Sequence, residues 1–159
     1  LGCRHLAFLR TGSMQPGETD KRGDGFEMVC RTRNIPCEVF RQNGDGDADA
    51  FRAFFRSHTK NGKLEIDGIF CSTDLLAERI RKILAESGIR IPEDVQIIGF
   101  DGIRQLGTNS LYCSTIIQPV EKLAETCVDL LLAPDRSNIP SLVCLPGSYA
   151  PGGTTQEEF

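Results

Sequence analysis

The chain has 159 residues, of which 40% are hydrophobic and 25% charged, so it is long enough to bury one core or to form one lobe of a larger body. Its formal net charge of −4 argues against direct nucleic-acid binding, which depends largely on Lys and Arg replacing counterions. No apolar run approaches the roughly 18 to 20 residues of a membrane span, and the first residues lack the charged and apolar regions of a secretion signal.

The first half of the chain alternates predicted strands and helices. Gly23 and Gly25 fall inside the first helix, where each costs roughly 1 kcal/mol relative to alanine, which indicates a close approach of this helix to the sheet. In the second helix Phe51, Phe54 and Phe55 share one face, which favours packing in the core. The expected elements are a strand at 4–9, a helix at 20–33, a strand at 37–40, a helix at 48–58 and a turn at 61–62.

The next stretch, 66–101, is the most regular part of the chain and is typical of a parallel βαβ unit. Its two apolar runs have the character of strands buried on both faces. Thr73 and Asp74 offer side-chain oxygens to the first N–H groups of the intervening helix, which ends at Gly88. Because parallel strands end at the same edge of the sheet, where doubly wound folds bind ligands, Thr73 and Asp101 are expected on one rim.

The remaining elements follow Asp101. The helix that begins at Pro119 carries an apolar stripe. We expect a strand at 113–118, the helix at 119–132, a linker at 134–140 and a last strand at 142–145. The whole order predicts an α/β fold in which a parallel sheet is flanked by helices on both faces. The stripe consists of Val120, Leu123, Ala124, Cys127 and Leu131.

Sequence motifs for metal sites, cofactors or catalysis are incomplete. Seven cysteines have no C-x-x-C spacing, lie mostly in apolar runs and indicate buried residues in a reducing cytoplasm. Asp45, Asp47 and Asp49 suggest a calcium loop, but Ala50 and Arg56 stand where it needs glycine and glutamate, so a solvated turn is favoured. G-x-G-x-x-G, P-loop and G-x-S-x-G motifs are absent. We therefore predict no metal, no cofactor and no enzymatic activity.

Three segments carry a family resemblance. They read IDGIFCSTDLLA (66–77), GIRIPEDVQIIGFD (88–101) and STIIQPVEKLA (114–124). In this order and with these gaps they resemble the effector-binding domain of the lactose-repressor/galactose-repressor family of transcription regulators. The resemblance implies one lobe of a periplasmic-binding-protein-like fold that senses a small-molecule effector, such as a sugar or related polar metabolite. It also implies a cytoplasmic homodimer that contacts DNA only through a domain absent from this chain.

The resemblance also implies effector-binding positions. Asp101 matches an aspartate that contacts effector in the family. A carboxylate at this position can accept two hydroxyl hydrogen bonds. The alternative is that it caps the turn that follows. Arg22 matches an effector-binding arginine, with a surface arginine as the alternative. Thr73 stands where the family often has an asparagine, and Gln118 matches a residue near the hinge between two lobes. Gly102 replaces the family's usual second aspartate.

The same resemblance divides the chain. Residues 1–113 and 139–159 would form the C-terminal lobe, whereas 114–138 would supply a hinge strand and a helix of an otherwise missing N-terminal lobe. Burying each stripe residue of that helix is worth about 1.5–3 kcal/mol, so we expect it to dock on its own lobe in a changed position or on a second copy. The alternative function is one lobe of a sugar-binding transport receptor, which shares the two-lobed fold.

Overall fold

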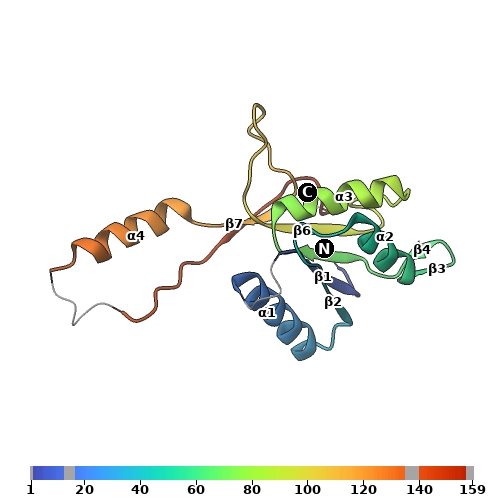
Figure 1. Ribbon diagram of the computed structural model, residues 1–159, viewed down its shortest axis with the longest axis horizontal. Coiled ribbons are helices and arrows are strands. Elements are labelled where there is room, and N and C mark those ends of the chain that lie inside the picture. Colours follow the sequence, from blue (N-terminus) through green and yellow to red (C-terminus); the bar gives the residue numbers. More distant parts are fainter. Residues whose placement is uncertain (1, 13–16, 135–139, 157–159) are drawn as a thin grey trace.

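A six-stranded sheet forms the body of the protein, in the order β2-β1-β5-β6-β7-β8 (Figure 1). The computed structural model describes residues 2–12, 17–134 and 140–156. Neighbouring strands are parallel except β8, which runs antiparallel to β7. The strands are β1 (Leu6–Arg10), β2 (Cys37–Arg41), β5 (Gly68–Cys71), β6 (Gln96–Asp101), β7 (Ser114–Ile117) and β8 (Ser148–Ala150), with a separate hairpin of β3 (Thr59–Lys60) and β4 (Lys63–Leu64). The helices are α1 (Glu18–Thr32), α2 (Ala48–Ser57), α3 (Asp74–Glu86) and α4 (Val120–Leu132).

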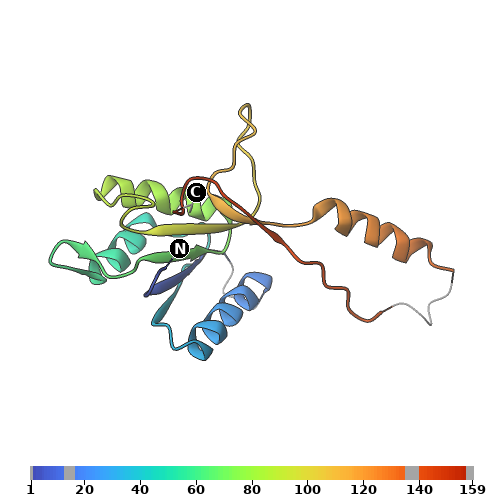
Figure 2. The ribbon, with the colours of Figure 1, turned by 180° about the vertical axis from the view of Figure 1, so that it is seen from behind.

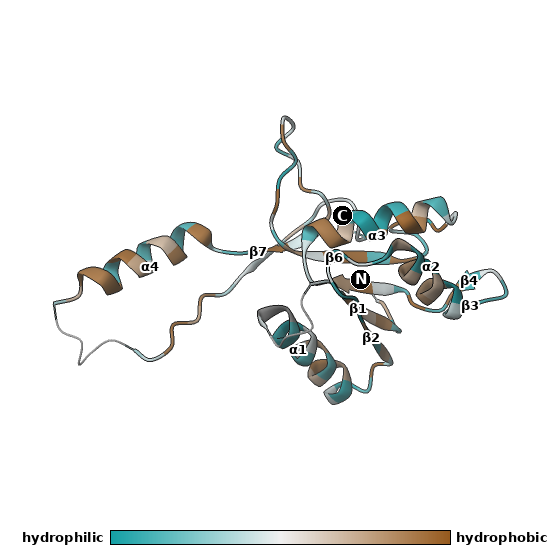
Figure 3. Ribbon diagram, viewed as in Figure 1, coloured by the Kyte–Doolittle hydropathy of each residue, from teal (hydrophilic) through white to brown (hydrophobic). Residues whose placement is uncertain are grey.

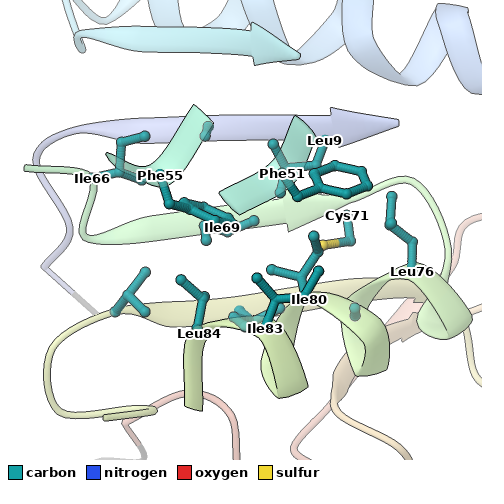
Figure 4. Close-up of a cluster of buried hydrophobic side chains, with 14 of the residues drawn as sticks. Leu9, Phe51, Phe55, Ile66, Ile69, Cys71, Leu76, Ile80, Ile83 and Leu84 are labelled. Atoms are coloured by element: carbon teal, nitrogen blue, oxygen red, sulfur yellow. The ribbon is translucent and has the colours of Figure 1, made fainter. Parts of the chain in front are cut away.

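The main core lies between one face of the sheet and the helices α2 and α3 (Figure 4). Phe51 and Phe55 of α2 are buried there, and Phe54 packs against the cluster, so the aromatic face predicted from the sequence is confirmed as core. Leu76 and Ile80 begin the apolar stripe of α3, which faces the same core. The predicted α/β fold, with a largely parallel sheet and helices on both faces, is therefore confirmed.

Helix α1 covers the opposite face of the sheet at β1 and β5. The Phe26 ring lies 5.8 Å from that of Phe8 and 6.4 Å from that of Phe70, measured between centroids. A Cβ atom on Gly23 would stand 2.9 Å from the Phe8 ring, which confirms the close approach predicted for this position. A Cβ on Gly25 would meet nothing within 4 Å, so that glycine does not serve the same purpose.

The predicted last strand at 142–145 is wrong. Those residues form no strand, and Leu142 and Val143 are 75% and 41% exposed. The last strand is β8, which pairs with β7 through Thr115↔Ala150 and Ile117↔Ser148. A short apolar run shows only that a segment is able to form a strand. Whether it does depends on which residues reach the free edge of the sheet. After α4, the chain first pairs with β7 at β8.

Helix α4 projects away from the body (Figures 1 and 2). None of its residues is buried, and Val120 and Leu131 are 65% and 84% exposed, so the apolar stripe coloured brown in Figure 3 faces solvent. The expectation that α4 docks on its own lobe is wrong, because none of its residues is buried and the described residues on either side of it, 118–119 and 140–147, lead away from the body. Docking on a second copy stays a prediction. Pro119 precedes the helix as its N-cap rather than serving as its first residue.

The cysteines are less buried than predicted. Cys30, Cys71 and Cys113 are buried, whereas Cys127 and Cys144 are exposed. The last two lie on α4 and on the segment that returns from it. Their exposure has the same cause as that of the α4 stripe, namely that these segments leave the core.

Candidate functional site

The carboxyl ends of β5, β6 and β7 meet at one edge of the sheet, as predicted from the βαβ pattern. Phe70 of β5 is aligned with Ile98 of β6, and Thr73 and Asp101 each follow three residues later. Asp101 is in turn aligned with Ile117 of β7, directly before Gln118. Three of the four predicted site residues therefore lie on neighbouring strand ends, which is where doubly wound sheets bind their ligands.

Asp101 and Gln118 are in direct contact. The Gln118 side-chain amide donates a hydrogen bond of 2.7 Å from Nε2 to Oδ1 of Asp101. Asp101 has a φ of +118°, in a region that costs a residue with a side chain roughly 1–3 kcal/mol, and Gly102 follows at +81°. The fold maintains this strained backbone at the edge where a ligand would bind, and such strain clusters at functional sites.

Arg22 bridges the ends of β5 and β6. Its Nη1 donates a hydrogen bond of 2.6 Å to the carbonyl oxygen of Ser72, and its Cζ lies 3.9 Å from the centre of the Phe100 ring. The first contact is to the neighbour of Thr73 and the second to the neighbour of Asp101. Within the part of the chain that the structure describes, Arg22 forms no ion pair. A guanidinium has five N–H donors, so Arg22 keeps donors for a hydroxyl or carboxylate ligand.

Thr73 is the N-cap residue of α3, the helix that follows it. Its Oγ1 accepts a hydrogen bond of 3.2 Å from the backbone N–H of Leu76 and so caps α3. The predicted cap is confirmed at this residue. A role in effector binding stays a prediction, since the hydroxyl oxygen already has one partner.

Asp74 does not cap α3 with its side chain, contrary to the expectation from the sequence. Its carboxylate is fully buried and accepts hydrogen bonds of 2.6 Å from Ile103 N–H and 2.5 Å from Thr115 Oγ1. As the first residue of α3, it also lies at the positive end of the helix dipole, which favours a buried negative charge. Asp74 therefore ties α3 to the turn after Asp101 and to β7. The side chain points away from the free N–H groups of its own helix because these two donors lie across the sheet edge.

Two further observations show how tightly the Asp74 carboxylate is enclosed. A Cβ atom added to Gly99 would come within van der Waals overlap of Oδ1, so only glycine fits at this point of β6. Burial, followed by the negative charge of Asp74, raises the pKa of the Cys113 thiol to about 12. A lone glycine inside a strand indicates a close approach, and this was the signal in the sequence that could have located the Asp74 site.

A second polar contact missing from the sequence reasoning fixes the start of α1. Arg10, 2% exposed at the end of β1, donates a hydrogen bond of 2.7 Å from Nη2 to Oδ2 of Asp20. The same oxygen accepts a hydrogen bond of 3.0 Å from Gly17 N–H, at the N-cap of α1. Since Arg22 is two residues beyond Asp20, this ion pair holds the Arg22 segment against the strand ends.

The described residues give no sign of metal binding or of a membrane segment. Across 2–12, 17–134 and 140–156, no group of three or more His, Cys, Asp or Glu side chains is arranged to hold an ion. Within the same ranges no helix has both the length and the apolar character needed to cross a bilayer.

These features define part of a ligand-binding domain with a largely parallel sheet flanked by helices. Residues 1–155 match the family described as the periplasmic binding protein-like domain, and the chain belongs to that family. Within it, the chain is part of the effector-binding domain of the lactose-repressor/galactose-repressor family, as the resemblance predicted.

Curated relatives are similar over most of this chain but are much longer. The sucrose operon repressor of Streptococcus mutans is 38% identical over 146 residues, which is 91% of this chain and 44% of the relative. The ribose operon repressor of Halalkalibacterium halodurans is 34% identical over 135 residues, which is 82% of this chain and 38% of the relative. The chain thus spans less than half the length of these two repressors.

Solved structures of longer regulators share the fold of this chain. A LacI family transcriptional regulator from Arthrobacter sp. FB24, in complex with lactose, aligns with a TM-score of 0.74 and 26% identity, over 97% of this chain and 57% of that one. A LacI-family regulatory protein from Corynebacterium glutamicum aligns with a TM-score of 0.72 and 27% identity, over 97% and 59%.

Proposed function

We propose that this chain is the effector-sensing part of a DNA-binding transcription regulator that acts in the cytoplasm. The names of the curated relatives, repressors of the sucrose and ribose operons, support this reading. The net charge of −4 supports DNA contact through a domain that this chain does not include. A homodimer is proposed by analogy with the family.

The observation that carries the proposal is that a donor and an acceptor lie at neighbouring strand ends of one sheet edge. Arg22 spans β5 and β6 through Ser72 and Phe100, and Asp101 presents its carboxylate beside Gln118. A carboxylate that can accept hydroxyl hydrogen bonds, and a guanidinium with remaining donors at the same sheet edge, suit a sugar or a related polar metabolite. The site holds a ligand without changing it, so we propose no catalysis.

The division into lobes is also proposed from the family. Residues 1–113 and 139–159 belong to the C-terminal lobe, and 114–138 belong to an N-terminal lobe. The exposed apolar stripe of α4 supports this division, because a stripe of that kind is ordinarily packed against another layer. Effector held between the lobes changes their closure and thereby the spacing of DNA-binding domains in the dimer, which makes the protein a conformational switch.

The effector site is tested by NMR titration of this chain with lactose, sucrose and D-ribose. One lobe offers half of the cleft, so we expect weak binding, with amide shifts confined to residues near Arg22, Thr73 and Asp101. Asp101→Asn should weaken binding roughly tenfold to a hundredfold, the loss of a hydrogen bond to a charged group. Glu93→Gln, an exposed carboxylate that lies before the amino end of β6 and so at the opposite edge of the sheet, is the control. Shifts on another face, or tight binding by this chain alone, would contradict the proposed site.

The class of protein is tested by the coding sequence upstream of residue 1. A helix-turn-helix segment is expected for a regulator. A secretion signal there would instead support the transport receptor, the alternative that shares this fold.

A further inference from the structure

The two faces of β2 contact different helices. Successive residues of a strand point to opposite faces of its sheet. The Phe40 ring lies 5.5 Å from that of Phe51 on α2, measured between centroids, so Phe40 points into the main core. Cys37 lies three residues before Phe40 and Arg41 one residue after it. Both of these side chains therefore point to the other face, toward α1.

Arg41 shows how α1 lies along β2. Its Nε is 3.8 Å from Oδ1 of Asp20, and its Nη2 is 3.8 Å from Oδ1 of Asp24. Cys37 is four residues back along the strand, about 13 Å at 3.3 Å per residue. Cys30 is six residues beyond Asp24 on the helix, about 9 Å at 1.5 Å per residue. Because the chain reverses between α1 and β2, the two paths lead in the same direction and bring Cys30 to Cys37 (Figure 1).

The burial and the pKa of Cys30 agree with this placement. Cys30 is 2% exposed and lies two helical turns after Gly23, the residue at which α1 approaches the Phe8 ring most closely, so its side chain faces the sheet. Burial, followed by the nearness of Cys37 and a hydrogen bond between the two side chains, raises the pKa of the Cys30 thiol to about 11. Both cysteines are free thiols, and Cys37 is the more accessible of the two.

We propose that Cys30 and Cys37 form a redox-sensitive dithiol, which closes to a disulfide on reaction with a low-molecular-weight disulfide such as glutathione disulfide. Half-buried Cys37 reacts first. Its thiolate attacks one sulfur of glutathione disulfide, and the departing glutathione thiolate takes up a proton. Cys30 then gives up its proton and attacks the Cys37 sulfur, which releases the second glutathione. Two protein thiols are oxidised, and one glutathione disulfide is reduced to two thiols.

The disulfide would join the end of α1 to the first residue of β2. Disulfides inside cells are usually transient, and redox sensing is one of their uses. The two other buried cysteines do not offer the same chemistry. Cys71 ends β5, Cys113 precedes β7, and β6 lies between them. Their backbones are thus two strand spacings apart, about 9–10 Å, which is more than the roughly 7 Å that a disulfide can span.

The test identifies the disulfide by peptide mass spectrometry. The exposed Cys127 and Cys144 are first changed to serine, so that they cannot join two chains. The protein is equilibrated in glutathione buffers of defined composition, its free thiols are alkylated with N-ethylmaleimide, and it is cut with trypsin. Cleavage after Arg31 and Arg33 separates peptide 23–31 from peptide 34–41, so the two stay together only where a disulfide joins them.

We expect the joined peptides to predominate in glutathione disulfide and to separate on addition of dithiothreitol. Since the fold holds the two thiols together, the [GSH]²/[GSSG] ratio that reduces half of the disulfide should be at least tenfold higher for the folded chain than in urea. The thermal unfolding midpoint should rise by about 5 °C on oxidation. Cys30→Ser should leave Cys37 bound to one glutathione. Cys3→Ser, at another half-buried cysteine, is the matched control and should keep the joined peptides.

Three results would overturn the proposal. The first is that peptides 23–31 and 34–41 stay separate in glutathione disulfide, whether their cysteines are unmodified or each carries a glutathione. The second is that half-reduction occurs at the same glutathione ratio in the folded chain and in urea, since the pairing would then reflect only the short sequence separation. The third is that Cys37 pairs with Cys3 in preference to Cys30.

Discussion

Removal of the Asp74 carboxylate should destabilise the protein more than any other single carboxylate change at this edge. In Asp74→Ala, Ile103 N–H and Thr115 O–H lose their acceptor, and each donor left unsatisfied in a buried site costs about 1–3 kcal/mol. We expect a total loss of about 3–5 kcal/mol in the free energy of unfolding. Asp74→Asn keeps one acceptor oxygen, so its cost should be about half as large.

Urea denaturation monitored by circular dichroism measures these losses. With an m-value of about 1–3 kcal/mol per molar urea, Asp74→Ala should lower the unfolding midpoint by more than about 1 M. Asp45→Asn changes an exposed carboxylate and should stay within about 0.5 kcal/mol of the unmodified chain. Thr115→Val should cost less in the Asp74→Ala background than alone, because its hydroxyl has already lost the partner. If Asp74→Ala and Asp45→Asn unfold at the same urea concentration, the reasoning about Asp74 is refuted.

Two more predictions concern α1 and the α3–β6 loop. Gly23→Ala should destabilise the chain by about 1–2 kcal/mol, because its Cβ would stand 2.9 Å from the Phe8 ring. Gly25→Ala places its Cβ in open space and should stabilise the chain by about 0.5–1 kcal/mol. Thermal unfolding should therefore show a lower melting temperature for the first variant and a higher one for the second. Hydrogen bonds from the Arg90 side chain and backbone lower the pKa of Asp94 from 3.8 to about 2. The stabilisation from this pair should be complete above pH 3.8 and fall away as the pH drops through 2. NMR titration of the carboxyl should give that midpoint, and in Arg90→Ala the midpoint should rise toward 3.8.

The helix faces and the parallel order were predictable because their signals are local. The stripe of α3 and the aromatic face of α2 follow from a period of 3.6 residues, and the strands on either side of α3 are short apolar runs between clear turn signals. The rim that holds Thr73, Asp101 and Gln118 follows from the same pattern, since parallel strands end at a common edge.

What the sequence could not supply depends on contacts between distant segments. The run at 142–145 is apolar enough for a strand, but the neighbour of β7 is selected by the path of the chain back from α4. Asp74 has the sequence position of a helix cap, and only the fold brings Thr115, 41 positions away, to its carboxylate. The stripe of α4 has the pattern of a buried face, and whether another layer covers it depends on the chain around it.

Because β7 and β8 pair antiparallel, the two ends of the segment that contains α4 are joined to the body side by side. The polypeptide leaves the body at Ile117 and re-enters it at Ser148, and these two residues are partners in the ladder. A pull or tilt applied to α4 would therefore load both strands together rather than one flexible tether. Thr115 of β7 donates a hydrogen bond to the Asp74 carboxylate, which also accepts one from Ile103 N–H. A force on β7 would therefore reach the turn after Asp101 through these two hydrogen bonds.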